Sequence, residues 1–123
     1  QLRIVCRGEP VRISICHCLE CQKRTGSVFG MQARFPKDQV TRIAGESTIF
    51  TRPGDGGGTV NFHFCPRCGA TVYWELSGVP DAVAVAAGAF ADPQFPAPRV
   101  SVYEARRHGW VDLSGLPEIE RLG

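Results

Sequence analysis

Apolar residues recur at every second position near the start of the chain, which is the pattern of a strand with one buried face. The alternation covers residues 2–6 and returns at residues 11–15. In extended backbone a period of two places these apolar side chains on one side. The intervening Gly8-Glu9-Pro10 is typical of a turn. The pattern therefore predicts two strands joined by a turn.

Further along, the same criteria predict more strands, one short helix and one long loop. The helix is predicted at 19–25, where charged, unbranched residues are followed by Gly26 in the position of a left-handed helix end. The glycine-rich run at 53–58 predicts a loop, and the segment 117–121 predicts a short helix or a tail. The additional strands are predicted at 28–35, 48–51, 59–64 and 71–76, and around Val83, Val85, Val100 and Val102.

These elements indicate a single, mostly β domain spanning residues 1–123. The chain is 43% hydrophobic and 21% charged, which is ordinary for a globular protein that buries a modest core. Its longest weakly polar stretch, at 82–91, is alanine-rich, short and interrupted by glycine, so neither a membrane span nor a leader peptide is predicted. A cytoplasmic location is expected, since a reducing compartment keeps the six cysteines available as thiols.

The charge pattern argues against a nucleic-acid partner. The formal net charge is only +2, and the basic residues are dispersed, with Lys23-Arg24 and Arg106-Arg107 occurring as pairs and not as patches. Arginine supplies most of the positive charge, and its planar guanidinium suits small anionic ligands. The expected partners are therefore small molecules. No pattern in the sequence indicates an oligomeric state.

Five of the six cysteines have the spacing of zinc ligands. Cys16, Cys18 and Cys21 form a C-x-C-x2-C cluster, and Cys65 and Cys68 form a C-x2-C pair. Zinc is held tetrahedrally by sulfurs about 2.3 Å away, and a two-residue spacer lets both sulfurs of a tight turn converge on one ion. A C-x-C segment is too short to close comfortably as a disulfide. All five residues are therefore candidate metal ligands.

The spacing leaves two ligand sets open. In the first, Cys18, Cys21, Cys65 and Cys68 hold one structural zinc, and Cys16 is a spare thiol. In the second, Cys16 joins Cys18 and Cys21 at one ion whose fourth position is exchangeable, as in reactive zinc sites. Cys65 and Cys68 then require further ligands. The number of cysteines does not decide between the two.

Several segments, in order along nearly the whole chain, resemble the signatures of the glutathione-dependent formaldehyde-activating enzyme family, which includes the centromere protein V relatives. The resemblance rests on Cys16-His17-Cys18-Leu19-Glu20-Cys21-Gln22-Lys23-Arg24-Thr25-Gly26-Ser27, Phe64-Cys65-Pro66-Arg67-Cys68-Gly69-Ala70, Val72-Tyr73-Trp74, Ala87-Gly88-Ala89-Phe90, and Tyr103 to Trp110. This ordered combination is more specific than either cysteine motif alone.

The resemblance implies a β-tent fold with two zinc ions. Cys16, Cys18 and Cys21 would correspond to the reactive site, and Cys65 and Cys68 to half of a structural site. In the family the other half is a C-x-C-G just before the first strand, a segment that would precede Gln1 and that we expect to be missing from this sequence. The implied chemistry is a carbon–sulfur lyase reaction in which the glutathione thiol adds to formaldehyde or a related aldehyde.

Glutathione would be the co-substrate, and its carboxylates require cationic partners. Lys23, Arg24 and Arg52 are candidates, with Arg24 and the following Thr25 favoured because they lie within a turn or two of the thiols. The alternative function is a non-catalytic binding module stapled by zinc. His17 is expected to face solvent or to support a ligand, and Trp110 is expected to belong to the core.

Overall fold

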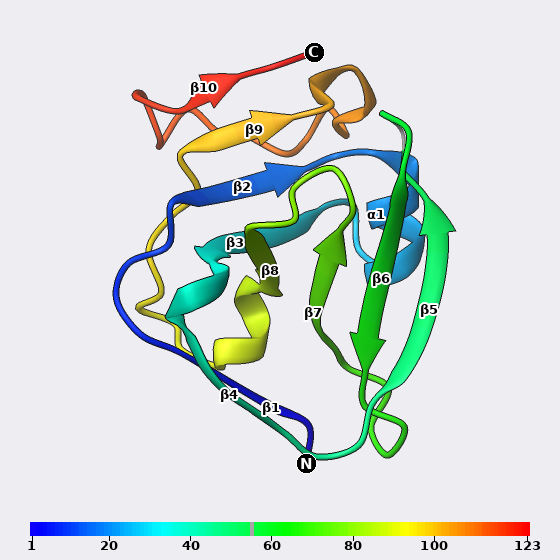
Figure 1. Ribbon diagram of the computed structural model, residues 1–123. Coiled ribbons are helices and arrows are strands. Elements are labelled where there is room, and N and C mark those ends of the chain that lie inside the picture. Colours follow the sequence, from blue (N-terminus) through cyan, green and yellow to red (C-terminus); the bar gives the residue numbers. More distant parts are fainter. Residues whose placement is uncertain (55) are drawn as a thin grey trace.

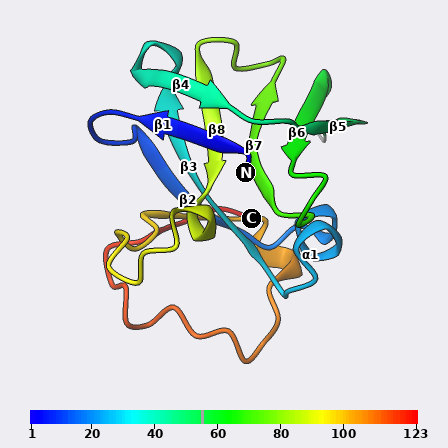
Figure 2. The same cartoon turned by 90° about the horizontal axis from the view of Figure 1, so that it is seen from below.

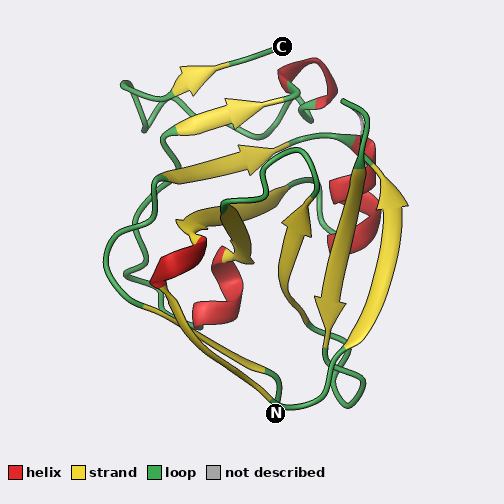
Figure 3. Cartoon of the chain, viewed as in Figure 1, coloured by secondary structure: helices red, strands yellow, loops and turns green. Residues whose placement is uncertain are grey.

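The computed structural model describes residues 1–54 and 56–123, and strands are its predominant regular secondary structure (Figures 1 and 3). Asp55, which belongs to the predicted loop, lies outside the described residues. The strands are β1 (Arg3–Cys6), β2 (Arg12–Cys16), β3 (Gly30–Pro36), β4 (Val40–Ala44), β5 (Thr48–Pro53), β6 (Thr59–Phe64), β7 (Thr71–Leu76), β8 (Ala82–Ala86), β9 (Val100–Val102) and β10 (Glu120–Arg121). The helices are α1 (Leu19–Thr25) and the 3-10 turns η1 (Lys37–Gln39), η2 (Ala87–Phe90) and η3 (Glu104–Arg106).

The strands form one large sheet and one small ribbon. The large sheet has eight strands in the order β10-β9-β2-β3-β8-β7-β6-β5, and the ribbon pairs β1 with β4. Strand β2 is antiparallel to β3 and parallel to β9, so the C-terminal part of the chain lies beside a strand from near its start. Figures 1 and 2 show the strong twist of the large sheet and the ribbon lying across one side of it.

Alternation along the strands gives the large sheet two different faces. One face packs with the β1–β4 ribbon into a core whose buried members include Leu2, Ile13, Phe35 and Val85. The opposite face of β2 carries Arg12, Ser14 and Cys16, because residues two apart in a strand point to the same side. This second face is the one that builds the site described below.

Most of the predicted elements are confirmed. Helix α1 has the predicted bounds and ends at Gly26, whose φ of 66° lies in the left-handed region that glycine adopts without strain. Strands β6 and β7 also have the predicted bounds. The structure therefore confirms a mostly β, single small domain with one α-helix among its described residues.

Three features differ from the sequence predictions. Strand β4 was not predicted, because most of its side chains are exposed and backbone pairing with β1 is what defines it. Residues Glu120–Arg121 form a short parallel strand beside β9, which is neither the short helix nor the tail predicted for 117–121. Trp110 is 72% exposed and does not belong to the core.

Candidate metal and substrate site

The end of β2 and the start of α1 bring three cysteines together. Cys16 is the last residue of β2, Cys18 is the N-cap of α1, and Cys21 lies in the first turn of that helix. The Cys18 sulfur accepts a hydrogen bond of 3.3 Å from the backbone N–H of Cys21. This capping bond fixes the loop between strand and helix, because it satisfies an N–H that the first turn leaves unpaired.

The geometry of the three thiols fits a zinc ion. All three side chains are buried, and their sulfur atoms lie within 4.8 Å of one another. Sulfurs bound tetrahedrally to zinc at 2.3 Å are about 3.8 Å apart, so small side-chain adjustments suffice to bind the ion. Among the residues described, these three are the only group of three or more histidine, cysteine or acidic side chains close enough for this role.

The thiols also differ in their affinity for protons. The pKa of Cys21 is lowered to about 5, chiefly because the Cys16 thiol hydrogen-bonds to its sulfur, with further help from Cys18 and the Arg24 guanidinium. The pKa of Cys16 is raised because it hydrogen-bonds to Cys21 and is buried. Burial raises the pKa of Cys18. One thiolate is therefore favoured before any metal binds, which suits a site that must lose protons to bind a cation.

His17 supports the thiol loop from the side facing the C-terminal segment. Its side chain is completely buried, its Nε2 lies 3.0 Å from Ser101 Oγ, and its backbone N–H donates to Val102 O at 3.1 Å. Ser101 in turn donates to Glu104 at 2.6 Å. The prediction that His17 supports the ligands agrees with these contacts, and the alternative of solvent exposure is wrong. The histidine anchors both neighbouring cysteines to β9.

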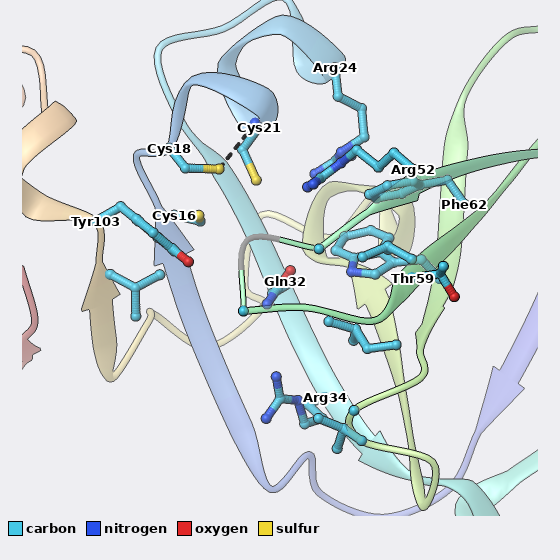
Figure 4. A pocket seen from close by; sticks show the side chains of 18 of the residues that line it. Cys16, Cys18, Cys21, Arg24, Gln32, Arg34, Arg52, Thr59, Phe62 and Tyr103 are labelled. Carbon is cyan, nitrogen blue, oxygen red and sulfur yellow. Dashed lines mark hydrogen bonds between the residues drawn. The ribbon is translucent and has the colours of Figure 1, made fainter.

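The three thiols open into a cavity of about 540 Å³ on the second face of the large sheet (Figure 4). Phe62 and Trp74 form an aromatic part of its wall, with ring centroids 5.4 Å apart. Four arginines also line it: Arg12, Arg24, Arg34 and Arg52. The cavity thus combines three sulfurs that could hold a metal, an apolar wall and positive charge, which is the composition expected of a site for a small anion with an apolar part.

Of the predicted glutathione contacts, some line the cavity and others do not. The Arg24 guanidinium lines the cavity and lies 4.6 Å from the Trp74 ring centroid, a cation–π contact that holds it in place. Arg52 lines the cavity as well and lies 5.4 Å from the Phe62 centroid. Thr25 is not among the described residues that line it, and its hydroxyl donates instead to the Cys21 carbonyl at 2.8 Å. Lys23 is largely exposed and contacts Glu20 at 3.5 Å.

Cys65 and Cys68 form a second, separate feature. They bracket a tight turn after β6, closed by a 2.7 Å hydrogen bond from the Gly69 N–H to the Cys65 carbonyl. Cys65 is buried and accepts a hydrogen bond of 3.1 Å from the Gln1 side chain, whereas Cys68 is exposed. That hydrogen bond lowers the pKa of Cys65 to about 6, with the backbone N–H groups of Cys68 and Arg67 contributing. Among the described residues, Cys18 and Cys21 group with Cys16 and not with Cys65 and Cys68. This grouping favours the second ligand set over the single structural zinc.

Sequence reasoning missed several cavity residues because they are distant in the chain. Arg12, Gln32 and Arg34 carry no motif, and only the register of β2 and β3 places them on one face. Gly30 is opposite Cys16 in that register, and a Cβ there would lie 3.1 Å from the Arg24 guanidinium and 3.4 Å from Cys21 Cβ. The strand alternation could have assigned Arg12 to the face of Cys16, but only the strand pairing could have added Arg34.

Comparisons with known proteins identify the family of this chain. The profile of a family described as glutathione-dependent formaldehyde-activating enzyme matches residues 1–106. A protein of Fusarium vanettenii named "Putative glutathione-dependent formaldehyde-activating enzyme" is 27% identical over 85 residues, which covers 62% of this chain and 45% of that protein. The match thus spans about half the length of this relative. Among the described residues, no helix has the length and apolar character required to cross a membrane.

Proposed function

The chain belongs to the glutathione-dependent formaldehyde-activating enzyme family, and we propose that it is a zinc-dependent carbon–sulfur lyase acting on glutathione and formaldehyde or a related aldehyde. The observation that carries the proposal is the group of three buried thiols at one end of an arginine-lined cavity. A zinc site that only stabilises a fold does not need thiols that open into a cavity. A non-catalytic binding module therefore accounts less well for this arrangement.

In the proposed reaction the glutathione sulfur attacks the aldehyde carbon. A carbon–sulfur bond forms, the carbonyl π electrons move to oxygen, and that oxygen takes up the proton that the thiol loses, giving S-hydroxymethylglutathione. Zinc held by Cys16, Cys18 and Cys21 would offer a fourth position to a thiol and lower its pKa, which raises the fraction of reactive thiolate. Three thiolate ligands give the ion little Lewis acidity, which favours this role over polarisation of the aldehyde.

The chain's own residues would position the thiol. Phe62 and Trp74 provide the apolar wall beside the sulfurs. Arg24 and Arg52, held against these rings, would pair with a glutathione carboxylate near the reacting end. Of the two predicted contacts, Thr25 has a different role in this proposal: its hydrogen bond to the Cys21 carbonyl holds the helix that carries the ligand.

We also propose a second, structural zinc site that uses Cys65 and Cys68. Its remaining ligands would come from a C-x-C segment preceding Gln1, as the resemblance implies. The contact of the Gln1 side chain with Cys65 Sγ supports this assignment, because it brings the start of the chain against the half-site. We place the protein in the cytoplasm, since both sites require reduced thiols.

The test combines zinc stoichiometry with the rate of thiol addition. Elemental analysis of the zinc-loaded protein and of Cys16→Ser should show one zinc fewer in the variant. NMR exchange spectroscopy should show faster interconversion of glutathione, formaldehyde and their adduct with wild type than with Cys16→Ser. Cys6→Ser is the matched control, because Cys6 is a half-buried cysteine of β1 outside both clusters. An exchange rate unaffected by the zinc-loaded wild type would refute the proposed activity.

A further inference from the structure

Two arginines face each other directly on the cavity side of the large sheet. Arg12 of β2 and Arg34 of β3 are partners in the antiparallel register, and both line the cavity. Like charges directly opposite each other on one face of a sheet destabilise it. The pKa of Arg34 is lowered, first by burial and then by the positive charge of Arg12. The fold therefore maintains an unfavourable pair of cations at this position.

The described part of the chain offers neither arginine a compensating carboxylate. Its ion pairs involve Lys23, Arg107, Arg121 and two histidines, and include neither Arg12 nor Arg34. The Nε atoms of both arginines are buried without a hydrogen-bond partner. By contrast, Arg121, near the end of the chain, contacts Glu104 at 3.1 Å. Arg24 Nε, in the same cavity, is unpaired as well, so a bound anion would supply hydrogen-bond acceptors that the cavity arginines lack.

The pair lies at the opposite end of the cavity from the thiols. Cys16 and Arg12 are four residues apart in β2, which separates their Cα atoms by about 13 Å. Gln32 lies between the two ends, as Figure 4 shows for Cys16, Gln32 and Arg34. On the neighbouring strand β8, Ala84 is the register partner of Arg34 and Ala86 that of Gln32. Both alanines pack with Phe62 and Trp74, so the aromatic wall adjoins the strand that carries Gln32 and Arg34.

We propose that Arg12 and Arg34 bind the α-carboxylate of the γ-glutamyl arm of a glutathione-type thiol whose sulfur lies at the cysteine cluster. This inference rests on the proposed function and specifies which thiols the site accepts. In extended glutathione that carboxylate is roughly eight bonds from the sulfur, or about 10 Å. Long arginine side chains close the remaining distance. Two guanidiniums can hold one carboxylate through paired N–H···O bonds, which relieves both their repulsion and their unsatisfied donors.

The assignment makes this pair a determinant of specificity. Arg24 and Arg52 already stack on aromatic rings near the sulfurs and would serve the shorter, glycyl arm. A thiol without a distant carboxylate would leave Arg12 and Arg34 unpaired and bind weakly. The chain should therefore discriminate against small neutral thiols even where these reach the metal.

Calorimetric binding to the zinc-loaded protein tests the proposal without relying on turnover. The probes are S-methylglutathione, whose blocked sulfur cannot react, and its derivative with the γ-glutamyl α-carboxylate converted to an amide. Wild type should bind the carboxylate at least about 10-fold more tightly than the amide. Arg12→Gln and Arg34→Gln should each weaken carboxylate binding roughly 10- to 100-fold, the range for a hydrogen bond to a charged group, and alter amide binding about twofold or less.

The matched control is Arg42→Gln, because Arg42 is an exposed arginine of β4 outside the cavity, and it should change neither affinity. Thermal melts of the ligand-free variants separate binding from structure. Removal of one of two repelling charges should leave the melting temperature of Arg34→Gln equal to or above that of wild type. If Arg34→Gln instead melts at a lower temperature and binds the carboxylate and amide probes equally more weakly, the pair has a structural role and the proposal is overturned.

The remaining outcomes distinguish this proposal from the proposed function. If the variants lose the carboxylate ligand selectively while wild type fails to accelerate adduct exchange, the subsite stands and the proposed reaction fails. If wild type accelerates exchange and the variants bind both probes as it does, the reaction stands and the subsite is refuted. A zinc-loaded wild type that binds neither probe also refutes the subsite.

Discussion

Glu104 connects the thiol loop to the end of the chain, and neutralising it should destabilise the protein by a calculable amount. Its carboxylate accepts a hydrogen bond of 2.6 Å from Ser101 and lies 3.1 Å from Arg121 and 3.3 Å from the buried His17 ring. Glu104→Gln keeps the shape of the side chain and removes its charge. The variant thus isolates the electrostatic part of these contacts.

The magnitude follows from the environment of each contact. A partly buried hydrogen bond to a charged group contributes about 1.5–3 kcal/mol and a neutral one about 0.5–1.5, so the Ser101 contact loses roughly 1–1.5 kcal/mol. The Arg121 side chain is 43% exposed, and solvent screening limits that pair to about 0–1 kcal/mol. The sum is about 2 kcal/mol. For 123 residues, with an unfolding entropy of about 2.1 cal/mol/K per residue, this corresponds to a melting temperature lower by about 8 °C.

The pH dependence of this difference provides the sharper test. Burial alone would raise the pKa of Glu104, but the Ser101 hydrogen bond and the charges of Arg121, His17 and Arg107 together hold it below its usual value. A carboxylate with a depressed folded-state pKa stabilises fully above its unfolded pKa of about 4.3, and this stabilisation is lost as pH falls through the folded value. The gap between wild type and Glu104→Gln should therefore persist from pH 7 to about 5.5 and close below pH 4.

Thermal melts of both proteins across this pH range measure the gap. Protonation of the cysteines and loss of metal destabilise both proteins at low pH, and the difference between them cancels this contribution. Glu20→Gln is the control. Glu20 is a 47% exposed carboxylate that, among the described contacts, pairs only with Lys23 at 3.5 Å. Its substitution should shift the melting temperature by less than about 2 °C. Equal melting temperatures at pH 7, or a gap unchanged at pH 4, would refute the reasoning.

Two further predictions concern the core and the helix end. Ile13→Ala should lower the free energy of unfolding by about 2–5 kcal/mol in urea titrations, because Ile13 is fully buried in the main core and its truncation leaves a cavity. A loss below about 1 kcal/mol would show that neighbouring side chains move in to fill that cavity. Gly26→Ala should lower the same free energy by about 1 kcal/mol, because an alanine at a φ of 66° is strained although a Cβ there meets no atom within 4 Å. An unchanged urea midpoint would contradict that assignment of strain.

The sequence was sufficient for local features and insufficient for those set by strand pairing. Helix α1 follows from its composition and from Gly26, and the grouping of the Cys16, Cys18 and Cys21 thiols follows from a spacing that six residues of chain enforce. Strand alternation also separated the two faces of β2. Such predictions depend only on neighbours in the chain.

The order of the strands was beyond this reasoning. The pairing of β1 with β4, and of β2 with β9, depends on contacts between segments far apart in the sequence. The lining of the cavity could not be predicted for the same reason, because only the register of β2 with β3 brings Arg34 to it. His17 shows the same effect: the sequence left solvent exposure and support of a ligand both open, and only the presence of β9 beside it makes it buried.

The contact between His17 and Ser101 has a consequence for the order of events during synthesis. The two residues are 84 positions apart, and the thiol loop precedes the strand that anchors it. At a translation rate of about 5–20 residues per second, the three thiols are synthesised roughly 4–17 seconds before that strand. A nascent chain therefore carries the three thiols without this anchor for several seconds. The thiol loop therefore acquires its β9 contacts only after most strands of the large sheet have been synthesised.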